Sequence, residues 1–303
     1  MLDYKLLQAL ANVIQEGGFD KASQRLNITQ SAVSQRIKLL EDQLGTLLVT
    51  RTVPPTPTTQ GKLLLKHYMQ VQSLETDLEV NLIPLARENF HLFSLGINAD
   101  SLATWFFPAI TSFLKENRVL LDLKMDDQEQ THKLLRNGEV SGCISSENTP
   151  VQGCSVTPIG TMNYRMVAAP QFLQTHFPQG FEKDRLKTAP AVVYNRKDDL
   201  HSRFLNTIFQ TPVSGKSTSE NFFKNIPIHY LPSPEKFMGL ILAGLAYGMV
   251  PDLQGLPHLK SGHLIDLVPD THIGVDLYWH RWNLSSLLLD EFSKTIVKNA
   301  VIC

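Results

Sequence analysis

Residues 19–45 have the sequence FDKASQRLNITQSAVSQRIKLLEDQLG. Ala22 is a small apolar residue on the inner face of a first short helix, and Asn27–Thr29 forms a tight turn. Thr29 can cap a second helix, because its hydroxyl accepts hydrogen bonds from the free amides of the first turn. Gly45 suits the left-handed residue that ends such a helix. The stretch therefore predicts two helices joined by a tight turn.

The second helix has an apolar face and a polar face. Val33, Ile37, Leu40 and Leu44 recur at helical spacing, so this side packs inward. The other side begins with short or flexible donors and acceptors, which a helix entering the major groove end-on needs to contact base edges. Basic side chains nearby would hold phosphates and fix the register. The candidate DNA-binding residues are Thr29, Gln30, Ser31, Ser34, Gln35, Arg36, Lys38 and Arg51, the last three as phosphate contacts.

An ordinary three-helix bundle, whose polar face only meets water, would show the same periodicity. The flanking segments favour DNA binding instead. Leu47–Val53 predicts a strand after the second helix of the turn, ended by Pro54 and Pro55. From Thr58 to about Arg87, apolar residues in steps of three and four predict a long helix resembling a coiled coil, which Pro84 kinks or ends early. Its expected purpose is to connect and dimerise.

From residue 91 onward, strand and helix patterns alternate. Such alternation predicts mainly parallel sheets with helices on both faces. Helices are expected over Ala103–Glu116 and Glu129–Asn137. The expected strands are His91–Asn98, Val119–Asp126, Val140–Ser145, Ala189–Asn195, Ile226–Leu231, Tyr247–Val250 and Val275–Trp279.

Composition and charge are those of a soluble globular protein. The 303 residues are 43% hydrophobic and 19% charged, which suits two or three domains and argues against disorder. The net charge is −1, but residues 1–66 hold eight Lys or Arg against five Asp or Glu, so a basic end joins an acidic body. The scattered Cys143, Cys154 and Cys303 suit a reducing compartment. With no signal peptide or membrane span indicated, we expect a cytoplasmic location.

Several stretches resemble the LysR-type transcriptional regulators: residues 22–26, 29–41, 44–45, Arg51 and 57–61. The likeness covers the whole chain in layout and is very specific in the first 65 residues. Residues 98–105, 136–140 and 278–281 further resemble the ArgP/LysG-like branch, which senses lysine or arginine.

The resemblance implies a homo-oligomer, a dimer or a dimer of dimers, that bends promoter DNA and acts with RNA polymerase. It also implies a multidomain fold: an all-α winged helix-turn-helix domain, a long linker helix, and an α/β effector domain of two lobes like those of periplasmic binding proteins. The ligand cleft would lie between the lobes. The implied boundaries are 1–57 for DNA binding, 58–90 for the linker and 91–303 for the effector domain, with lobe I at 91–162 and 266–303 and lobe II at 163–265.

Ligands of open α/β sheets bind beyond the carboxyl ends of strands. The first effector strand ends at Asn98–Ser101, where free helix amides could receive a ligand carboxylate, or where Asp100 and Ser101 only cap the helix. A cationic side chain would need carboxylates, and each acid at a strand end has an alternative role as a cap or solvated loop residue. The candidate ligand-binding residues are Asn98, Asp100, Ser101, Asp126, Asp127, Ser233 and Asp252.

Two other function classes compete with a ligand-responsive regulator. An α/β enzyme with an N-terminal helical dimerisation appendage lacks support, because the chain has no phosphate-binding Gly-x-x-x-x-Gly-Lys loop, Gly-x-Ser-x-Gly elbow or His-Glu-x-x-His motif. An effector-independent architectural DNA-binding protein would leave the acidic strand ends without a role. His280 has no partner at a metal-ligand spacing. We therefore expect no enzyme activity, no cofactor and no metal.

Overall fold

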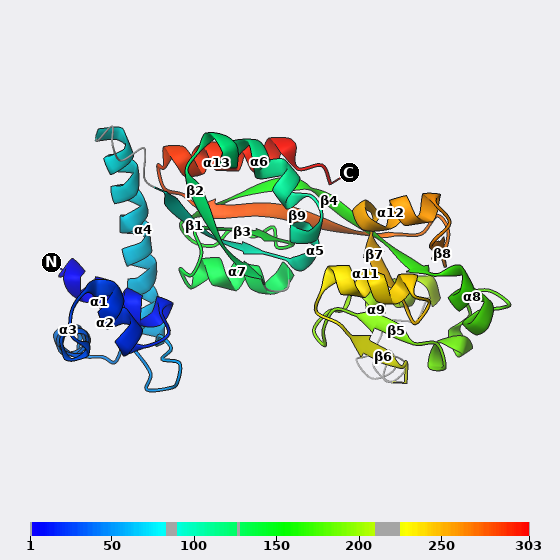
Figure 1. The fold of residues 1–303 in the computed structure, drawn as a ribbon, viewed down its shortest axis with the longest axis horizontal. Helices are drawn as coiled ribbons and strands as arrows, with labels where there is room; N and C mark the ends of the chain where they lie inside the picture. Colours follow the sequence, from blue (N-terminus) through cyan, green and yellow to red (C-terminus); the bar gives the residue numbers. More distant parts are fainter. Residues whose placement is uncertain (1, 83–89, 126–127, 210–224, 303) are drawn as a thin grey trace.

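The computed structural model describes residues 2–82, 90–125, 128–209 and 225–302 (Figure 1). It has a helical N-terminal domain, a long helix and an elongated α/β domain, as the sequence predicts. The helices of the first two parts are α1 (Tyr4–Gln15), α2 (Phe19–Leu26), α3 (Gln30–Leu44) and α4 (Thr59–Leu82).

One apolar core joins the N-terminal helices to the start of α4. Leu10 of α1 and Val33 of α3 are fully buried in it, and Tyr68 of α4 is buried against them. The hydroxyl of Thr58 accepts a 3.1 Å hydrogen bond from the amide of Gly61, so Thr58 caps α4. The base of the long helix is therefore part of the folded domain.

The strand expected over Leu47–Val53 is wrong. Among the described residues of this segment, the only β pairing is one isolated bridge between Val49 and Pro57. Prolines at positions 54, 55 and 57 have no amide hydrogen to donate, so a longer ladder cannot form. Two backbone hydrogen bonds flank this bridge, from the amide of Thr50 to the carbonyl of Thr56 at 2.8 Å and from the amide of Thr58 to the carbonyl of Leu48 at 2.9 Å. A Glu41 carboxylate oxygen also accepts from the amide of Leu48 at 2.8 Å.

The α/β domain contains a nine-stranded sheet with the order β2-β1-β3-β9-β4-β7-β5-β6, and β8 pairs with β4. The sheet is mixed where a mainly parallel one was expected, because β4 and β9 each pair only in the antiparallel sense. The strands are β1 (His91–Ile97), β2 (Val119–Met125), β3 (Gly142–Ser145), β4 (Cys154–Ala168), β5 (Ala191–Val193), β6 (Ile228–Tyr230), β7 (Tyr247–Pro251), β8 (Ile265–Asp266) and β9 (Ile273–Trp282).

The long strand β4 has no counterpart among the expected strands. Pro158 and Gly160 interrupt its pattern, and the register with β9 shifts between them. Both residues weaken a strand when read locally. In the fold, the irregularity lets β4 and β9 run together from one half of the domain to the other (Figure 1).

Helices cover both halves of this sheet. In lobe I, α6 and α13 lie on one face and α7 on the other (Figure 1). The helices of the domain are α5 (Ala99–Ala103), α6 (Phe106–Glu116), α7 (Gln128–Arg136), α8 (Pro170–His176), α9 (Leu200–Phe209), α11 (Pro234–Leu242), α12 (Asp252–Lys260) and α13 (Leu287–Asn299), with a 3₁₀ turn at Lys183–Lys187. Within the described ranges, no helix is both long enough and apolar enough to cross a bilayer.

Candidate functional sites

The helix α3 presents the polar face that DNA contact would require. Thr29 caps it, since its hydroxyl accepts from the amide of Ala32 at 3.2 Å. Val33 and Ile37 are buried on the inner side. Of the candidate DNA-binding residues, Arg36 is partly buried and the others are exposed: Thr29, Gln30, Ser31, Ser34, Gln35, Lys38 and Arg51.

The expected inner stripe of α3 is one residue too long. Leu44 is 41% exposed, because Gly45 ends the helix in the left-handed conformation just beyond the domain core. Farther along the helix, the Glu41 carboxylate accepts a hydrogen bond from the backbone of the following loop, at the amide of Leu48. The exposed surface suited to a DNA groove is thus the first two turns of α3.

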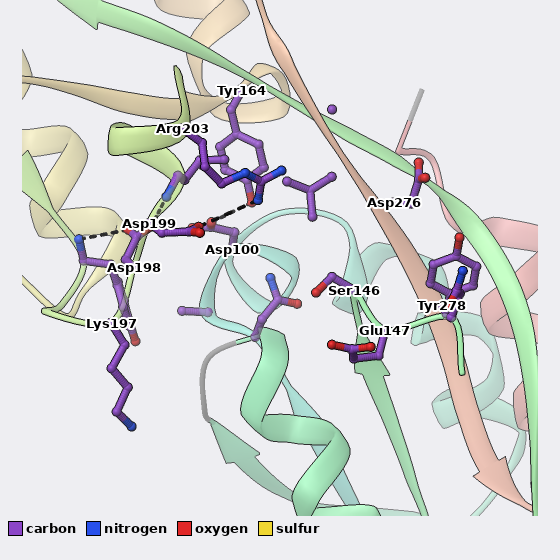
Figure 2. Close-up of a pocket in the computed structure, with 17 residues that line it drawn as sticks. Asp100, Ser146, Glu147, Tyr164, Lys197, Asp198, Asp199, Arg203, Asp276 and Tyr278 are labelled. Carbon is purple, nitrogen blue, oxygen red and sulfur yellow. Dashed lines mark hydrogen bonds and ion pairs between the residues drawn. The ribbon is translucent and has the colours of Figure 1, made fainter. Parts of the chain in front are cut away.

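A cleft of about 470 Å³ lies where the two lobes meet (Figure 2). Lobe I contributes the residues that follow β1 and β3, and lobe II contributes those that follow β5. Tyr164 of β4 supplies the part between the lobes, together with residues 274–276 and Tyr278 of β9. The parallel strands β1, β3 and β5 therefore direct their carboxyl ends toward one space, as expected for a ligand site.

Acidic side chains outnumber basic ones around this cleft. Lys197 and Arg203 are the basic residues among the described residues that line it. The acidic residues are Asp100, Glu147, Asp198, Asp199 and Asp276. A negative potential focused by the walls of a cleft attracts cations.

Asp100 is a buried acid of the cleft with a strongly raised pKa. Its Oδ2 accepts a 2.8 Å hydrogen bond from the hydroxyl of Tyr164 (Figure 2). Burial raises the pKa of Asp100 to about 6, and the charge of Asp198 adds to the shift while the Tyr164 hydrogen bond opposes it. A cation beside Asp100 would relieve both unfavourable effects.

Asp198 and Asp199 precede α9 on the opposite side of the cleft. Asp198 accepts from the amide of Leu200 at 3.0 Å, which fixes its carboxylate at the start of the helix. Asp199 pairs with Arg203 one turn later, at 3.7 Å between Oδ1 and Nη1. Both side chains of this pair are more than half exposed, so the pair contributes little to stability.

Two of the candidate ligand-binding residues line the cleft, Asn98 and Asp100. The Asn98 side chain is 3% exposed, and neither its Oδ1 nor its Nδ2 has a hydrogen-bond partner among the described residues. Ser101 is fully buried beside it, also with an unpaired Oγ. The expectation that Asp100 or Ser101 caps the helix is wrong, because Asn98 occupies the N-cap position of α5 without a side-chain cap bond.

Among the described residues, the candidates Ser101, Ser233 and Asp252 do not line the cleft. Asp126 and Asp127 lie outside the described residues. Ser233 precedes α11. Asp252 is committed to an ion pair, since its Oδ1 accepts from Nε of Arg165 at 2.9 Å, and the same guanidinium reaches Asp266 at 3.2 Å. Burial opposes charge at this cluster, and the hydrogen bond to Asp252 is the main reason why the pKa of Arg165 is raised.

Several lining residues were missed from the sequence, including Tyr164, Asp198, Asp199, Arg203 and Asp276. The run Arg196–Asp199 directly follows the expected strand Ala189–Asn195, so the rule for strand ends applied there could have found Asp198 and Asp199. Tyr164 and Asp276 lie inside long strands, where no local signal distinguishes them. Asp276 is held by Thr161, whose hydroxyl donates to its Oδ1 at 2.7 Å across β4 and β9.

In the described ranges, no group of three or more His, Cys, Asp or Glu side chains is arranged to hold a metal ion. His280 instead makes a 2.7 Å hydrogen bond between its Nε2 and the carbonyl oxygen of Glu147. This hydrogen bond supports the loop that follows β3.

Comparison with known proteins covers both parts of the chain. Residues 4–62 match the family model "Bacterial regulatory helix-turn-helix protein, lysR family", and residues 86–300 match "LysR substrate binding domain". The HTH-type transcriptional regulator ArgP of Pseudomonas fluorescens (strain Pf0-1) is 40% identical over 301 residues, which cover 99% of this chain and 97% of that protein.

Two solved structures are similar over the whole chain. The crystal structure of ArgP from Mycobacterium tuberculosis has a TM-score of 0.85 and 36% identity, covering 99% of this chain and 98% of that one. Full-length LysG from Corynebacterium glutamicum with bound effector Arg has a TM-score of 0.74 and 32% identity, with the same coverage.

Proposed function

Because the chain belongs to the LysR family of bacterial helix-turn-helix regulators, we propose that it controls transcription in response to arginine or lysine bound in the cleft between its lobes. Its relatives over the full chain are transcription regulators. The chain is likewise a DNA-binding transcription regulator and not an enzyme. The domain boundaries that this proposal uses are 1–57, 58–90 and 91–303, with lobe II at 163–265.

The excess of carboxylates around the cleft is the observation that carries the effector proposal. Asp100 and Asp198 come from opposite lobes and repel each other, so a cationic side chain between them gains from both. Arg203 is the group we assign to the effector's carboxylate, because a guanidinium matches it with two hydrogen bonds. The LysG structure with bound Arg supports this ligand class.

On the DNA side, we assign base contacts to Gln30, Ser31, Ser34 and Gln35, with Thr29 fixing the start of α3. We assign phosphate contacts to Arg36, Lys38 and Arg51. The support is their exposure: on and just before α3 all of them except the partly buried Arg36 are exposed, and Arg51 is exposed in the loop that follows the helix. In this arrangement the short side chains discriminate sequence and the basic ones provide affinity.

We further propose that the chain assembles through α4 as a homodimer or a homotetramer. Leu64 and Leu65 pack against the N-terminal core, but four other leucines along the described part of α4 are exposed: Leu63, Leu74, Leu78 and Leu82. Apolar side chains spaced along one helix are buried when a second copy packs against them. The assembly would contact RNA polymerase at the promoter, in the cytoplasm where that DNA lies.

Effector binding can be tested by calorimetric titration of the full chain with L-arginine, L-lysine and L-citrulline. Citrulline has nearly the shape of arginine but no charge, so we expect it to bind at least tenfold more weakly than arginine. Equal affinity for citrulline would remove the charge argument. No detectable binding of any of the three ligands would overturn the effector proposal and leave the DNA-binding assignment intact.

A further inference from the structure

A second, smaller cavity lies beside the effector cleft. Its volume is about 40 Å³. It shares with the cleft the lining residues Asp100, Tyr164, Tyr194, Asp198 and Leu200. A water molecule needs roughly 10–15 Å³ of such space, so the cavity holds a few non-hydrogen atoms and not a whole amino acid. Only the end of a side chain that starts in the cleft could enter it.

His201 is the buried polar group at this cavity. It is the second residue of α9 and is 5% exposed. Neither ring nitrogen has a hydrogen-bond partner among the described residues, and the ring packs against Tyr247 with 5.3 Å between centroids. Burial lowers the pKa of His201 to about 4, so the imidazole is neutral at physiological pH and one nitrogen is a free acceptor. Buried polar groups without partners are rare in folded proteins and call for a reason.

We propose that this cavity, which we call the His201 pocket, receives the cationic end of the effector's side chain, and that His201 selects a guanidinium over an ammonium group. The inference rests on the proposed function and names a specificity-determining residue for it. The walls fit such a guest: Val192, Phe237 and Met249 provide apolar surface for methylene groups. Asp100 and Asp198 provide negative charge at the side shared with the cleft.

The number of donors on each ligand explains the selection. A guanidinium has five N–H donors in one plane, and an ammonium group has three. Asp100 already accepts from Tyr164, and Asp198 accepts from the amide of Leu200, so part of the carboxylate capacity is used. An ammonium group can be satisfied by what remains. A guanidinium directs its donors in fixed directions within one plane, so a donor that points away from both carboxylates needs a further acceptor, which the imidazole nitrogen supplies.

The test compares L-arginine with L-lysine in calorimetric titrations of the full chain. In His201→Phe, which keeps a ring against Tyr247 but removes the acceptor, we expect arginine affinity to fall at least tenfold and lysine affinity less than threefold. His201→Gln keeps an amide oxygen as an acceptor, so its arginine affinity should lie between those of wild type and His201→Phe. The matched control His229→Phe changes an exposed histidine of the same lobe and should leave both affinities unchanged.

A ligand variant tests the same pocket without relying on a folded mutant. Nω-methyl-L-arginine keeps the charge, loses one donor and adds a methyl group that the small cavity cannot easily hold. We expect it to bind wild type at least tenfold more weakly than arginine. Equal affinity for the methylated ligand, or equal losses for arginine and lysine in His201→Phe, would overturn the His201 pocket. If wild type binds neither arginine nor lysine, the proposed effector class fails together with the His201 pocket. Failure of the pocket alone differs, because wild type then still binds arginine or lysine.

Discussion

The hydroxyl of Tyr164 donates a 2.8 Å hydrogen bond to the carboxylate of Asp100. This contact joins β4, the strand that runs between the lobes, to the first turn of α5 in lobe I. It holds the carboxylate against the cleft, where burial raises its pKa to about 6. The bond therefore stabilises a charge that the surroundings disfavour, and a cationic ligand would complete its neutralisation.

Asp100→Asn should remove most of the effector affinity. The amide keeps the size of the side chain but loses the charge that pairs with the cation, which costs about 2 kcal/mol or more, roughly thirtyfold in Kd. Calorimetry with L-arginine measures the change. The matched control is Asp184→Asn, whose carboxylate is 93% exposed and lies outside the cleft. Unchanged affinity in Asp100→Asn would exclude Asp100 from the site.

Effector affinity should depend on pH between 5 and 7. The ligand cation binds the deprotonated carboxylate of Asp100, so below its pKa of about 6 a proton must leave before the ligand binds. Affinity for L-arginine should therefore rise by about tenfold from pH 5 to pH 7 and then level off. Titrations of Asp100→Asn across the same range should be flat. A slope of the same size in the variant would assign the titration to another group.

Asp252→Asn should affect stability and leave effector binding alone. The change weakens the pairing with Arg165, while Asp266 still contacts that guanidinium. The free energy of unfolding should fall by about 1–3 kcal/mol, since a largely buried charge loses one partner. Urea unfolding and arginine titration are the two measurements. A loss of arginine affinity as large as that expected for Asp100→Asn would contradict this prediction and show that Asp252 contributes to effector binding.

Substitutions on α3 should separate sequence discrimination from general affinity. Ser34→Ala and Gln35→Ala should cost about 1–3 kcal/mol on a promoter fragment and relax its discrimination from unrelated DNA. Arg36→Ala should weaken all DNA alike and reduce the salt dependence by about one released ion. Gel-shift titrations at several salt concentrations measure both effects. Lys294→Ala on α13 is an exposed control, and unchanged promoter binding in all three α3 variants would refute the assignment of this face.

Leu78→Glu on α4 should weaken self-association. The side chain is 57% exposed in the single chain, and a charge there would have to be buried in a dimer along this helix. Sedimentation velocity should show a shift toward monomer that grows on dilution. Leu245→Glu changes a leucine of similar exposure in lobe II and should leave the assembly unchanged. An unaltered oligomer in Leu78→Glu would place the interface elsewhere.

The sequence alone determined the helix-turn-helix and the exposed face of α3, because the sequence signals for these features are local. Thr29 caps α3 with its own hydroxyl, Gly45 ends the helix in a left-handed conformation, and the buried Val33 and Ile37 set which face is turned outward. Each of these depends on residues a few positions apart. Helical periodicity and cap chemistry are therefore enough to place the exposed side chains.

Only the tertiary structure decided the effector cleft, since its groups come from segments far apart in the chain. Asp100 meets Tyr164 across 64 positions, and Thr161 meets Asp276 across 115. The strand β4 that brings these segments together passes through Pro158 and Gly160, which oppose a strand in any local reading. Pairing along β9 outweighs that local preference. The same packing places Asp252 in an ion pair with Arg165 and places His201 in the cavity beside the cleft. Which acids face a ligand therefore depends on how distant segments pack together, and not on the spacing of residues in the sequence.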